Sequence, residues 1–420
     1  RNSKASDVID GMPLPNPTGG AKTDIYTYVP AHGDILSTIN PEAHESVKFL
    51  KGAAATALYG SAGSNGVILI STKKGQQGKA KIDFSSSVTF DQASVLPELQ
   101  YSYMQTTAPS ASSPGSSESW GAKGSAADPV KDFFRTGTTW VNSMNFSSGN
   151  EKSTSFFSYS NTTNKGIVPT SKFDQNNINY RNTSKFLDDR LTLDANVMAS
   201  VQKVINRTNP GMYFSPFLGL YLFPRGLDFN SYANNYEYFS PSRYLNAQNW
   251  WNINLDKNYK GDDTQQNPYW VLNRNQVTTN NKNIYSSASL NYKLTDWLNV
   301  QARGNYNYYK MDAQRNVYAT TQGVISGTNG KLYFNDLESK TYYSDLIFLG
   351  KNKINPDLSV DYTVGASVSD IKKKNTTIEN ATLSYPNLFI LSNLIFSGTN
   401  DNGRHYKIEN HHIQTQSVFA

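Results

Sequence analysis

The sequence predicts a mainly β fold, in which a large antiparallel barrel crosses a membrane and a smaller α+β segment precedes it. Three observations predict this fold: long runs of alternating apolar and polar residues, connections that are alternately short and long, and the composition. The 420 residues include 27 Tyr and 20 Phe, and only 17% are charged. Aromatic residues favour strands, whereas helical proteins carry more Ala, Leu, Glu and Lys.

Apolar and polar residues alternate from residue 81 onward, most clearly over residues 191–202 and 358–368. Alternation makes one face of a sheet apolar and the other polar. Soluble sandwiches share this period, but their strands typically have about 5–6 residues. Several runs here reach ten residues or more, as in transmembrane barrels. Tyr292, Tyr306 and Tyr308 lie near the ends of runs, where interfacial aromatic residues are expected.

The connections between these runs provide a second test. Long connections are predicted at residues 92–138, 204–282, 313–340 and 374–408, and turns of a few residues separate them. Outer-membrane barrels combine short periplasmic turns with long extracellular loops. A loop of 79 residues would be improbable inside a compact soluble domain. We expect roughly ten strands here against about 22 in outer-membrane transporters, so the barrel would not close within this chain.

The residues before 79 follow a different pattern. Residues 40–42 read Asn-Pro-Glu, the order of a helix N-terminus with Asn as the cap and Pro in the first turn. We therefore expect a helix over residues 42–51, ended by Gly52 in a left-handed conformation. Residues 67–71 form an apolar run with the length of a buried strand.

The composition also excludes several kinds of site. There is no Cys, which excludes disulfides and any Cys-ligated metal. The net charge is +6, but the basic residues are scattered and form no nucleic-acid-binding stripe. No apolar run approaches the ~18–20 residues of a membrane helix. His411 and His412 are adjacent on a predicted strand and face opposite ways. We predict no metal site and no cofactor, although loop carboxylates could hold calcium.

Three ordered segments resemble a known family. Residues 8–14 read V-I-D-G-M-P-L and are similar to the Y-V-I-D-G-V-P segment of SusC/RagA plug domains. Residues 50–60 read L-K-G-A-A-A-T-A-L-Y-G, and residues 65–75 read N-G-V-I-L-I-S-T-K-K-G; both are similar to plug motifs of that family. The chain thus resembles TonB-linked outer-membrane transporters of the SusC/RagA family. The positions that match the plug motif are Asp10, Gly11, Leu50, Lys51, Gly52, Tyr59, Gly60, Asn65 and Gly66.

The resemblance implies a domain organisation and a function. Residues 1–78 would be the C-terminal part of the plug domain, and residues 79–420 the N-terminal part of the barrel. The implied function is TonB-dependent active import of oligosaccharides or oligopeptides across the outer membrane of a Gram-negative, Bacteroidetes-like bacterium. A SusD-like surface lipoprotein would act as a lid, and TonB with its inner-membrane energising complex would pull on the plug. No covalent chemistry is implied, so we do not expect an enzyme.

The long connection at 204–282 is rich in aromatic residues, whose flat rings can stack on sugars or hold peptide side chains. The same rings could instead pack the loop against its neighbours or hold the lid. The candidate substrate-binding residues are Tyr213, Tyr236, Tyr238, Asn249, Trp250 and Trp251.

Two other readings remain. One is a siderophore or cobalamin receptor with the same architecture. The other is a secreted β-rich carbohydrate-binding protein or enzyme, which would need paired carboxylates in one cleft if it were a glycosidase. Extraction separates the readings, because a barrel requires detergent and a secreted protein does not.

Overall fold

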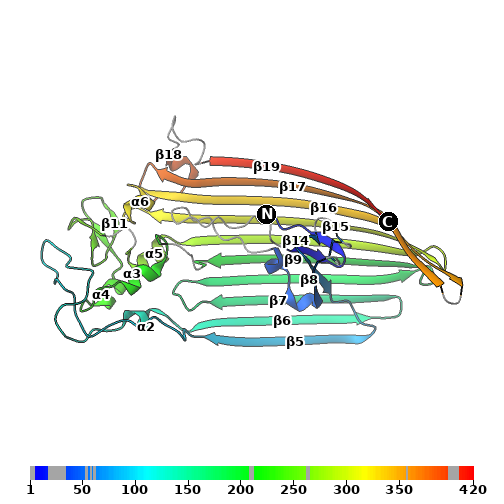
Figure 1. The fold of residues 1–420 in the computed structure, drawn as a ribbon, viewed down its shortest axis with the longest axis horizontal. Helices are drawn as coiled ribbons and strands as arrows, with labels where there is room; N and C mark the ends of the chain where they lie inside the picture. Colours follow the sequence, from blue (N-terminus) through cyan, green and yellow to red (C-terminus); the bar gives the residue numbers. More distant parts are fainter. Residues whose placement is uncertain are drawn as a thin grey trace.

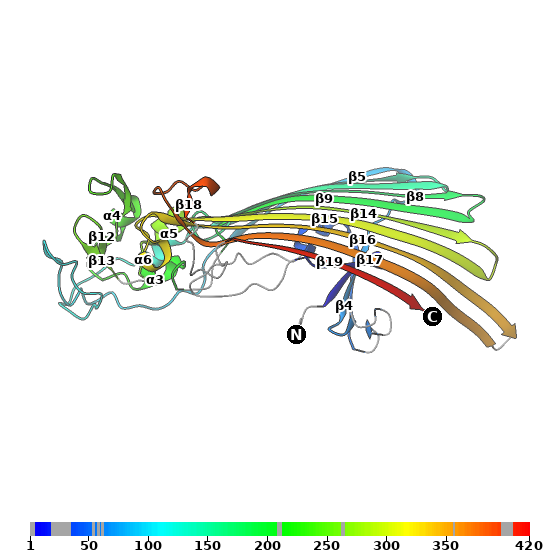
Figure 2. The same cartoon turned by 90° about the horizontal axis from the view of Figure 1, so that it is seen from above.

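The structure is a computed structural model, and its large and small sheets lie against each other (Figure 1). A large curved antiparallel sheet carries a small mixed sheet on its concave side, and short elements gather at one end (Figure 2). Among the described residues, no helix combines the length and the apolar character needed to cross a membrane. The described residues are 5–17, 35–52, 55–56, 59, 63–207, 212–261, 265–355, 358–395 and 406–420.

The large sheet has eleven strands, each antiparallel to its neighbours. Its order is β18-β17-β16-β15-β14-β9-β8-β7-β6-β5, and β19 also pairs with β17. Over the residues that the structure describes, the sheet stays open between β5 and β19. Its strands are β5 (Gly78–Asp91), β6 (Gly137–Gly149), β7 (Ser153–Lys165), β8 (Lys172–Phe186), β9 (Leu191–Ile205), β14 (Val277–Lys293), β15 (Leu298–Tyr318), β16 (Gly330–Asn355), β17 (Leu358–Leu383), β18 (Leu394–Ile395) and β19 (Tyr406–Phe419).

The predicted alternation divides this sheet into two chemically different faces. On β9, Asn196 and Met198 are 2% and 5% exposed on the concave face, whereas Val197 between them is 47% exposed on the convex face. Leu346 of β16 and Val364 of β17 are likewise exposed on the convex face. The prediction of a mainly β, barrel-type fold with one apolar face is confirmed.

The exposed apolar residues form a belt that crosses the strands obliquely. On β5 the belt is centred near Ser86, between Phe84 and Val88. The strand pairings connect Ser86 to Lys374 of β17, eight strands away, but the apolar run of β17 is centred near Val364, ten residues earlier. With ~3.3 Å per residue and ~4.8 Å between strands, this offset corresponds to a tilt of about 40°. Barrel strands tilt by about 35–45° from the barrel axis.

The small sheet contains four strands in the order β2-β1-β4-β3. Strand β1 (Ser6–Ile9) is antiparallel to β2 (Met12–Leu14) and parallel to β4 (Val67–Thr72), which is antiparallel to β3 (His44–Leu50). Because β4 is bonded on both sides, its apolar residues fill the middle of this sheet, as the run at 67–71 predicted. Two 3-10 turns, η1 (Ile35–Thr38) and η2 (Pro41–Ala43), precede β3.

The predicted helix over residues 42–51 is wrong. Asn40 does cap a helical turn, since its side chain accepts a hydrogen bond from the Glu42 amide, but the turn ends at Ala43. The following residues form β3, which pairs with β4. The segment His44–Leu50 is rich in weak helix formers such as His, Ser, Val and Phe. Because this segment has little intrinsic preference for a helix, pairing with the backbone edge of β4 determines its conformation.

Two of the predicted long connections have different bounds. Strand β15 continues to Tyr318, and β16 already begins at Gly330, so most of residues 313–340 is strand. Strand β17 likewise extends to Leu383, well into the predicted connection at 374–408. Beyond the belt, polar residues occupy the convex face and apolar ones such as Met311 and Val317 are buried on the concave face. The apolar residues thus change from the convex to the concave face there. The apolar face that was used to recognise the strand therefore ends before the strand does.

The remaining connections form a layer of short elements at one end of the large sheet (Figure 1). The two longest join β5 to β6 and β9 to β14, close to the predicted bounds 92–138 and 204–282, and the β15–β16 and β17–β18 connections add α6 and η4. The elements in this layer are α2 (Pro129–Phe133), α3 (Pro216–Tyr221), α4 (Phe229–Asn234), β10 (Glu237–Ser240), β11 (Leu245–Gln248), β12 (Ile253–Asn254), β13 (Tyr259–Lys260), α5 (Pro268–Arg274), α6 (Gly323–Ser326) and η4 (Leu391–Asn393).

Asn267 joins three segments of this loop layer. Its side-chain oxygen accepts a 2.9 Å hydrogen bond from the Tyr269 amide and so caps α5. Its side-chain nitrogen donates to the carbonyl oxygens of Tyr232, at 3.0 Å, and Asn249, at 2.8 Å. Because Asn267 is completely buried, no water can replace these bonds if its amide is removed.

We predict that Asn267→Ala loosens the loop layer, at a cost of about 2–4 kcal/mol from one lost cap and two unpaired carbonyls. Limited proteolysis should cut residues 206–276 faster in this variant, whereas Asn230→Ala, at an exposed position of α4, should leave the rate unchanged. Equal cleavage of both variants would contradict the role assigned to Asn267.

Candidate functional site

The small sheet contacts the concave face of the large sheet through a buried charged cluster centred on Arg181 of β8. Its guanidinium donates to both carboxylate oxygens of Asp194, at 2.8 and 2.7 Å. It also donates to Asp10, at 3.1 Å, and to the carbonyl oxygen of Thr72, at 2.9 Å. The Arg181 side chain is only 5% exposed, so water screens this cluster weakly. Lys74 adds a second cation, 3.1 Å from Asp194.

Asp10 also closes the small sheet on itself. Its two oxygens accept hydrogen bonds from the amide of Thr72, at 3.0 Å, and from the Thr72 hydroxyl, at 2.7 Å. Asp10 and Gly11 form the tight turn between β1 and β2, both with positive φ. The turn thus aims one carboxylate at the end of β4 and at Arg181 together.

Gly11 is needed at this turn for a second reason. A Cβ atom at Gly11 would lie 2.7 Å from a guanidinium nitrogen of Arg303 on β15. Arg303 is itself held by a two-pronged ion pair with Asp345 of β16, whose closest distance is 2.6 Å. The Tyr343 hydroxyl donates to the same carboxylate at 2.8 Å. The Asp-Gly pair of the motif therefore fits between two arginines of the large sheet.

Asn40 provides a third polar attachment. Its side-chain oxygen accepts hydrogen bonds from Glu42, at 3.1 Å, and from the Ser160 hydroxyl of β7, at 2.9 Å. Its nitrogen donates to Ser158 at 2.9 Å. One buried amide therefore starts η2 and also binds the large sheet. The sequence pattern showed only the first of these roles, because nothing in it relates residue 40 to residues 158 and 160.

Apolar side chains from both sheets meet beside these polar attachments. The shared cluster is completely buried and joins the 3-10 turn η1, strands β1 and β4, and four strands of the large sheet. Its members are Ile9, Leu14, Ile35, Ile39, Ile70, Met198, Tyr285, Tyr309, Met311 and Leu337. Burial of such a cluster is nondirectional, so the polar attachments set the orientation of the small sheet.

A polar cavity of about 340 Å³ lies next to the charged cluster. It is lined from the small sheet by Asp10, Glu45 and Lys74, and from the large sheet by Arg181 and Arg303. Space of this size with several polar walls can hold water. The contact between the two sheets therefore combines ion pairs, a polar cavity with room for water, and the apolar cluster beside it.

The other motif residues support the small sheet rather than the contact. Leu50 and Tyr59 pack against the buried cluster of Val8, Ala55 and Val67. Gly52 and Gly66 have positive φ, and a Cβ at Gly66 would lie 3.0 Å from the Leu50 carbonyl oxygen. Lys51 and Asn65 are exposed at the ends of β3 and of the loop before β4, and Gly60 lies outside the described residues.

The structure places Trp250 and Trp251 inside the loop layer. They are 1% and 5% exposed, and the Trp250 ring lies 5.1 Å from that of Phe223 and 5.5 Å from that of Tyr232. In this arrangement neither indole has a free face to stack on a substrate. They pack as core residues of the loop layer in this arrangement, and their contact with substrate stays a prediction that the burial does not favour.

The four other candidate substrate residues lie in separate surroundings. Asn249 donates to the Asn235 carbonyl oxygen at 2.8 Å, and the Tyr238 hydroxyl donates to Asn254 at 3.1 Å. Tyr213 packs at the edge of a different apolar cluster, and Tyr236 is half-buried. These residues are engaged within the protein, and their contact with substrate stays a prediction.

An exposed aromatic pair lies near them. Phe239 and Tyr244 are 53% and 85% exposed, and their rings meet edge to face at 5.3 Å. Both are in the aromatic-rich connection, but sequence composition cannot say which of its rings face solvent.

Tyr101 ties the two long connections together. Its hydroxyl donates to Asp128, the cap of α2, at 2.5 Å, and the Arg225 guanidinium lies 4.8 Å from its ring. Burial and the hydrogen bond to Asp128 raise the pKa of Tyr101 to about 12, so the hydroxyl keeps its proton at neutral pH. Through Tyr101 the two long connections are therefore expected to move as one unit.

In the small sheet, burial and the nearby charge of Lys73 lower the pKa of His44.

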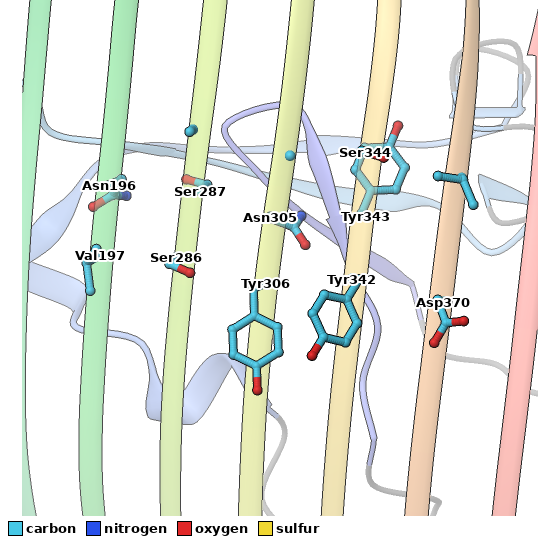
Figure 3. Close-up of a pocket in the computed structure, with 13 residues that line it drawn as sticks. Asn196, Val197, Ser286, Ser287, Asn305, Tyr306, Tyr342, Tyr343, Ser344 and Asp370 are labelled. Atoms are coloured by element: carbon cyan, nitrogen blue, oxygen red, sulfur yellow. The ribbon is translucent and has the colours of Figure 1, made fainter.

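The convex face of the large sheet carries aromatic side chains at the level of the charged cluster. Figure 3 shows Tyr306 of β15 and Tyr342 of β16 side by side, with Asp370 on the next strand, β17, and Val197 two strands away on β9. The two tyrosine rings are 4.8 Å apart. Within the described part of the chain, no three His, Cys, Asp or Glu side chains are grouped to hold a metal ion.

Comparison with known proteins gives related sequences. The chain is 28% identical over 301 residues to the TonB-dependent receptor SusC of Bacteroides thetaiotaomicron, covering 68% of this chain and 27% of that receptor. It is 25% identical over 341 residues to the TonB-dependent receptor P39 of Formosa agariphila, covering 78% of this chain and 30% of that receptor. The chain thus spans less than a third of the length of these relatives. No family model matches it.

Solved structures share the fold. The RagAB peptide importer in its open-open state superposes with a TM-score of 0.67 at 15% identity, covering 99% of this chain and 45% of that one. Its closed-closed state gives the same TM-score at 14% identity. Sequence relatives and fold neighbours agree: the chain is similar in sequence to TonB-dependent receptors, SusC among them, and it shares the fold of the RagAB importer.

Proposed function

We propose that this chain forms plug and barrel wall in a TonB-dependent importer of oligosaccharides or oligopeptides across the outer membrane. Residues 1–78 are then the C-terminal part of the plug, and residues 79–420 the N-terminal part of the barrel. The layer of short elements lies on the extracellular side, where a SusD-like lipoprotein closes over it. No catalytic step is part of this function.

One observation carries the proposal: the concave face holds the small sheet through polar and charged side chains, while the convex face carries an exposed apolar belt. An exposed apolar belt is unfavourable in water and suits hydrocarbon. A small sheet held inside a curved wall by hydrogen bonds and ion pairs blocks the space that the wall encloses. This combination fits a stoppered membrane pore, whereas a secreted adhesin or enzyme would have to cover the belt with a second layer.

The charged cluster is the proposed point of release. Arg181 contacts the small sheet at Asp10 and at Thr72, the last residue of β4. A pull by TonB on the plug would load these few directional bonds, and the adjoining polar cavity would let water replace them. The plug can therefore be displaced without unfolding the wall.

The proposal is tested by purification of the complete transporter from outer membranes. We expect extraction only with detergent, together with a surface lipoprotein and a bound oligosaccharide or peptide. Deleting the transporter should abolish growth on that compound. A protein recovered in the soluble fraction, or a detergent-extracted one with neither lipoprotein nor compound, would refute the proposal.

We predict that Arg181→Gln weakens the hold on the plug, because it leaves Asp10 and Asp194 without their shared cation. Removing one partner of a buried ion pair costs about 3–5 kcal/mol. The purified transporter should melt at a lower temperature, and cells should become sensitive to antibiotics too large for ordinary porins.

The matched control is Lys74→Gln, which removes a cation from the same cluster. The Lys74 side chain is 54% exposed, and an exposed ion pair contributes about 0–1 kcal/mol. Antibiotic sensitivity should therefore stay at the wild-type level. If both variants behave alike, the contact is not held by Arg181.

We predict that the exposed aromatic pair takes part in cargo binding. Changing Phe239 and Tyr244 together to Ala should weaken the affinity for the co-purified compound by about 1–3 kcal/mol, measured by calorimetry. Trp250→Ala should instead destabilise the loop layer by about 3–5 kcal/mol, because it leaves a cavity in a packed cluster. Unchanged affinity in the double variant would exclude the pair as a cargo contact.

A further inference from the structure

A row of lysines crosses the convex face of the large sheet. Lys282 of β14 is directly opposite Lys310 of β15, and Lys340 of β16 is directly opposite Lys372 of β17. Lys374 follows on the same face of β17. These five residues are called the basic row.

The basic row carries more positive charge than its neighbours neutralise. Lys310 pairs with Asp336, and Lys340 with Glu338, at 2.6 and 2.7 Å. The other three members are exposed and form no ion pair with any residue that the structure describes. Residues directly opposite on antiparallel strands have Cβ atoms about 4.5–5.5 Å apart, and like charges at such positions destabilise the pairing. A bound anion would relieve this repulsion.

The row lies at the edge of the apolar belt. Tyr306 and Tyr342 are on the adjacent level of the same face (Figure 3), and the Lys340 ammonium lies 5.9 Å from the Tyr308 ring. From the basic row, the strands run in one direction to the loop layer and in the other direction to the apolar belt. Aromatic residues at such a boundary mark the membrane interface in barrels. The lysines therefore lie where lipid head groups would be.

The surface at this place is also hollowed. A depression of about 310 Å³ between β16, β17 and β19 is lined by Lys340, Lys372, Lys374 and His412, among others. His412 pairs with Asp370 at 2.7 Å, so this histidine is already engaged. Lys340 is paired with Glu338, which also lines the depression, whereas Lys372 and Lys374 form no ion pair with a described residue and can reach an anionic group seated there.

We propose that the basic row binds the phosphorylated head group of an outer-leaflet glycolipid, whose acyl chains lie along the apolar belt. This inference rests on the membrane placement given under the proposed function. The continuity of cationic and apolar surface favours a lipid over a free anion, because inorganic phosphate has no part that the belt would bind. The bound lipid would fix the depth and tilt of the wall in the membrane.

The test compares the complete transporter with two triple variants that carry the same change in charge. Lys282→Gln, Lys372→Gln and Lys374→Gln remove the free members of the row. The control changes Lys293, Lys351 and Lys353 to Gln, all exposed near the short turns at the other end of the strands. Native mass spectrometry in mild detergent measures binding of a diphosphorylated acyl glycolipid, its dephosphorylated form and inorganic phosphate.

We expect the wild type and the control to bind the phosphorylated glycolipid equally, and the row variant to bind it roughly a hundredfold more weakly, at about fivefold per lysine. Dephosphorylated lipid should bind weakly to all three. Equal binding by both triple variants, or competition by inorganic phosphate at equal concentration, would overturn the proposal. Single Lys372→Gln replaces the triple variant if the latter melts below the control. Cargo uptake is scored separately, so a failure of import leaves the lipid result interpretable.

Discussion

The structure depends on one constraint: each long strand must present water-compatible side chains on one face and hydrocarbon-compatible ones on the other. On β9, Asn196 is buried on the concave face and the next residue, Val197, is exposed on the convex face. Repeated over nine long strands from β5 to β17 in register, the constraint produces a polar concave wall and an oblique apolar belt. The tilt of about 40° follows from the offset between belt and hydrogen-bond rows, because a belt perpendicular to a barrel axis must cross tilted strands obliquely. The same pattern of alternating residues therefore determines both the curvature of the wall and its depth in the membrane.

The polar concave wall then selects how the small sheet is held. An apolar wall would have buried the small sheet by area alone, which fixes neither its orientation nor its register. The wall instead offers Arg181, Ser158 and Ser160 to acceptors and donors at Asp10 and Asn40. Such bonds are directional, and water could replace them one at a time where a polar cavity adjoins them. The contact is thus directional, and under the proposed function a force applied at one point would open it.

Much of the fold could be predicted because alternation is a local signal. Strand β9 and the belt on β17 could be read from neighbouring residues alone. The failures came where a distant partner decides. Residues 44–50 became a strand because β4 lies beside them, and residues 313–318 stayed in the ladder after their apolar side had turned inward. Of the contact site, Asp10 and Gly11 were found through motif resemblance. Arg181 was not found, because 171 residues separate it from Asp10 and no periodicity connects them.

The aromatic residues of the loop layer show a limit of a different kind. Composition correctly indicated a segment rich in rings, but a ring that packs a core and a ring that meets a ligand have the same sequence signal. Trp250 is enclosed by Phe223, Phe229 and Tyr232, whereas Tyr244 projects from the turn between β10 and β11 with a positive φ. The largest rings are therefore poor candidates for ligand contact, because the largest side chains gain most from burial and pack inside the layer. A ligand-binding surface on such a loop therefore consists of the rings that do not pack in the core. These rings can be identified only once the packing of the core is known.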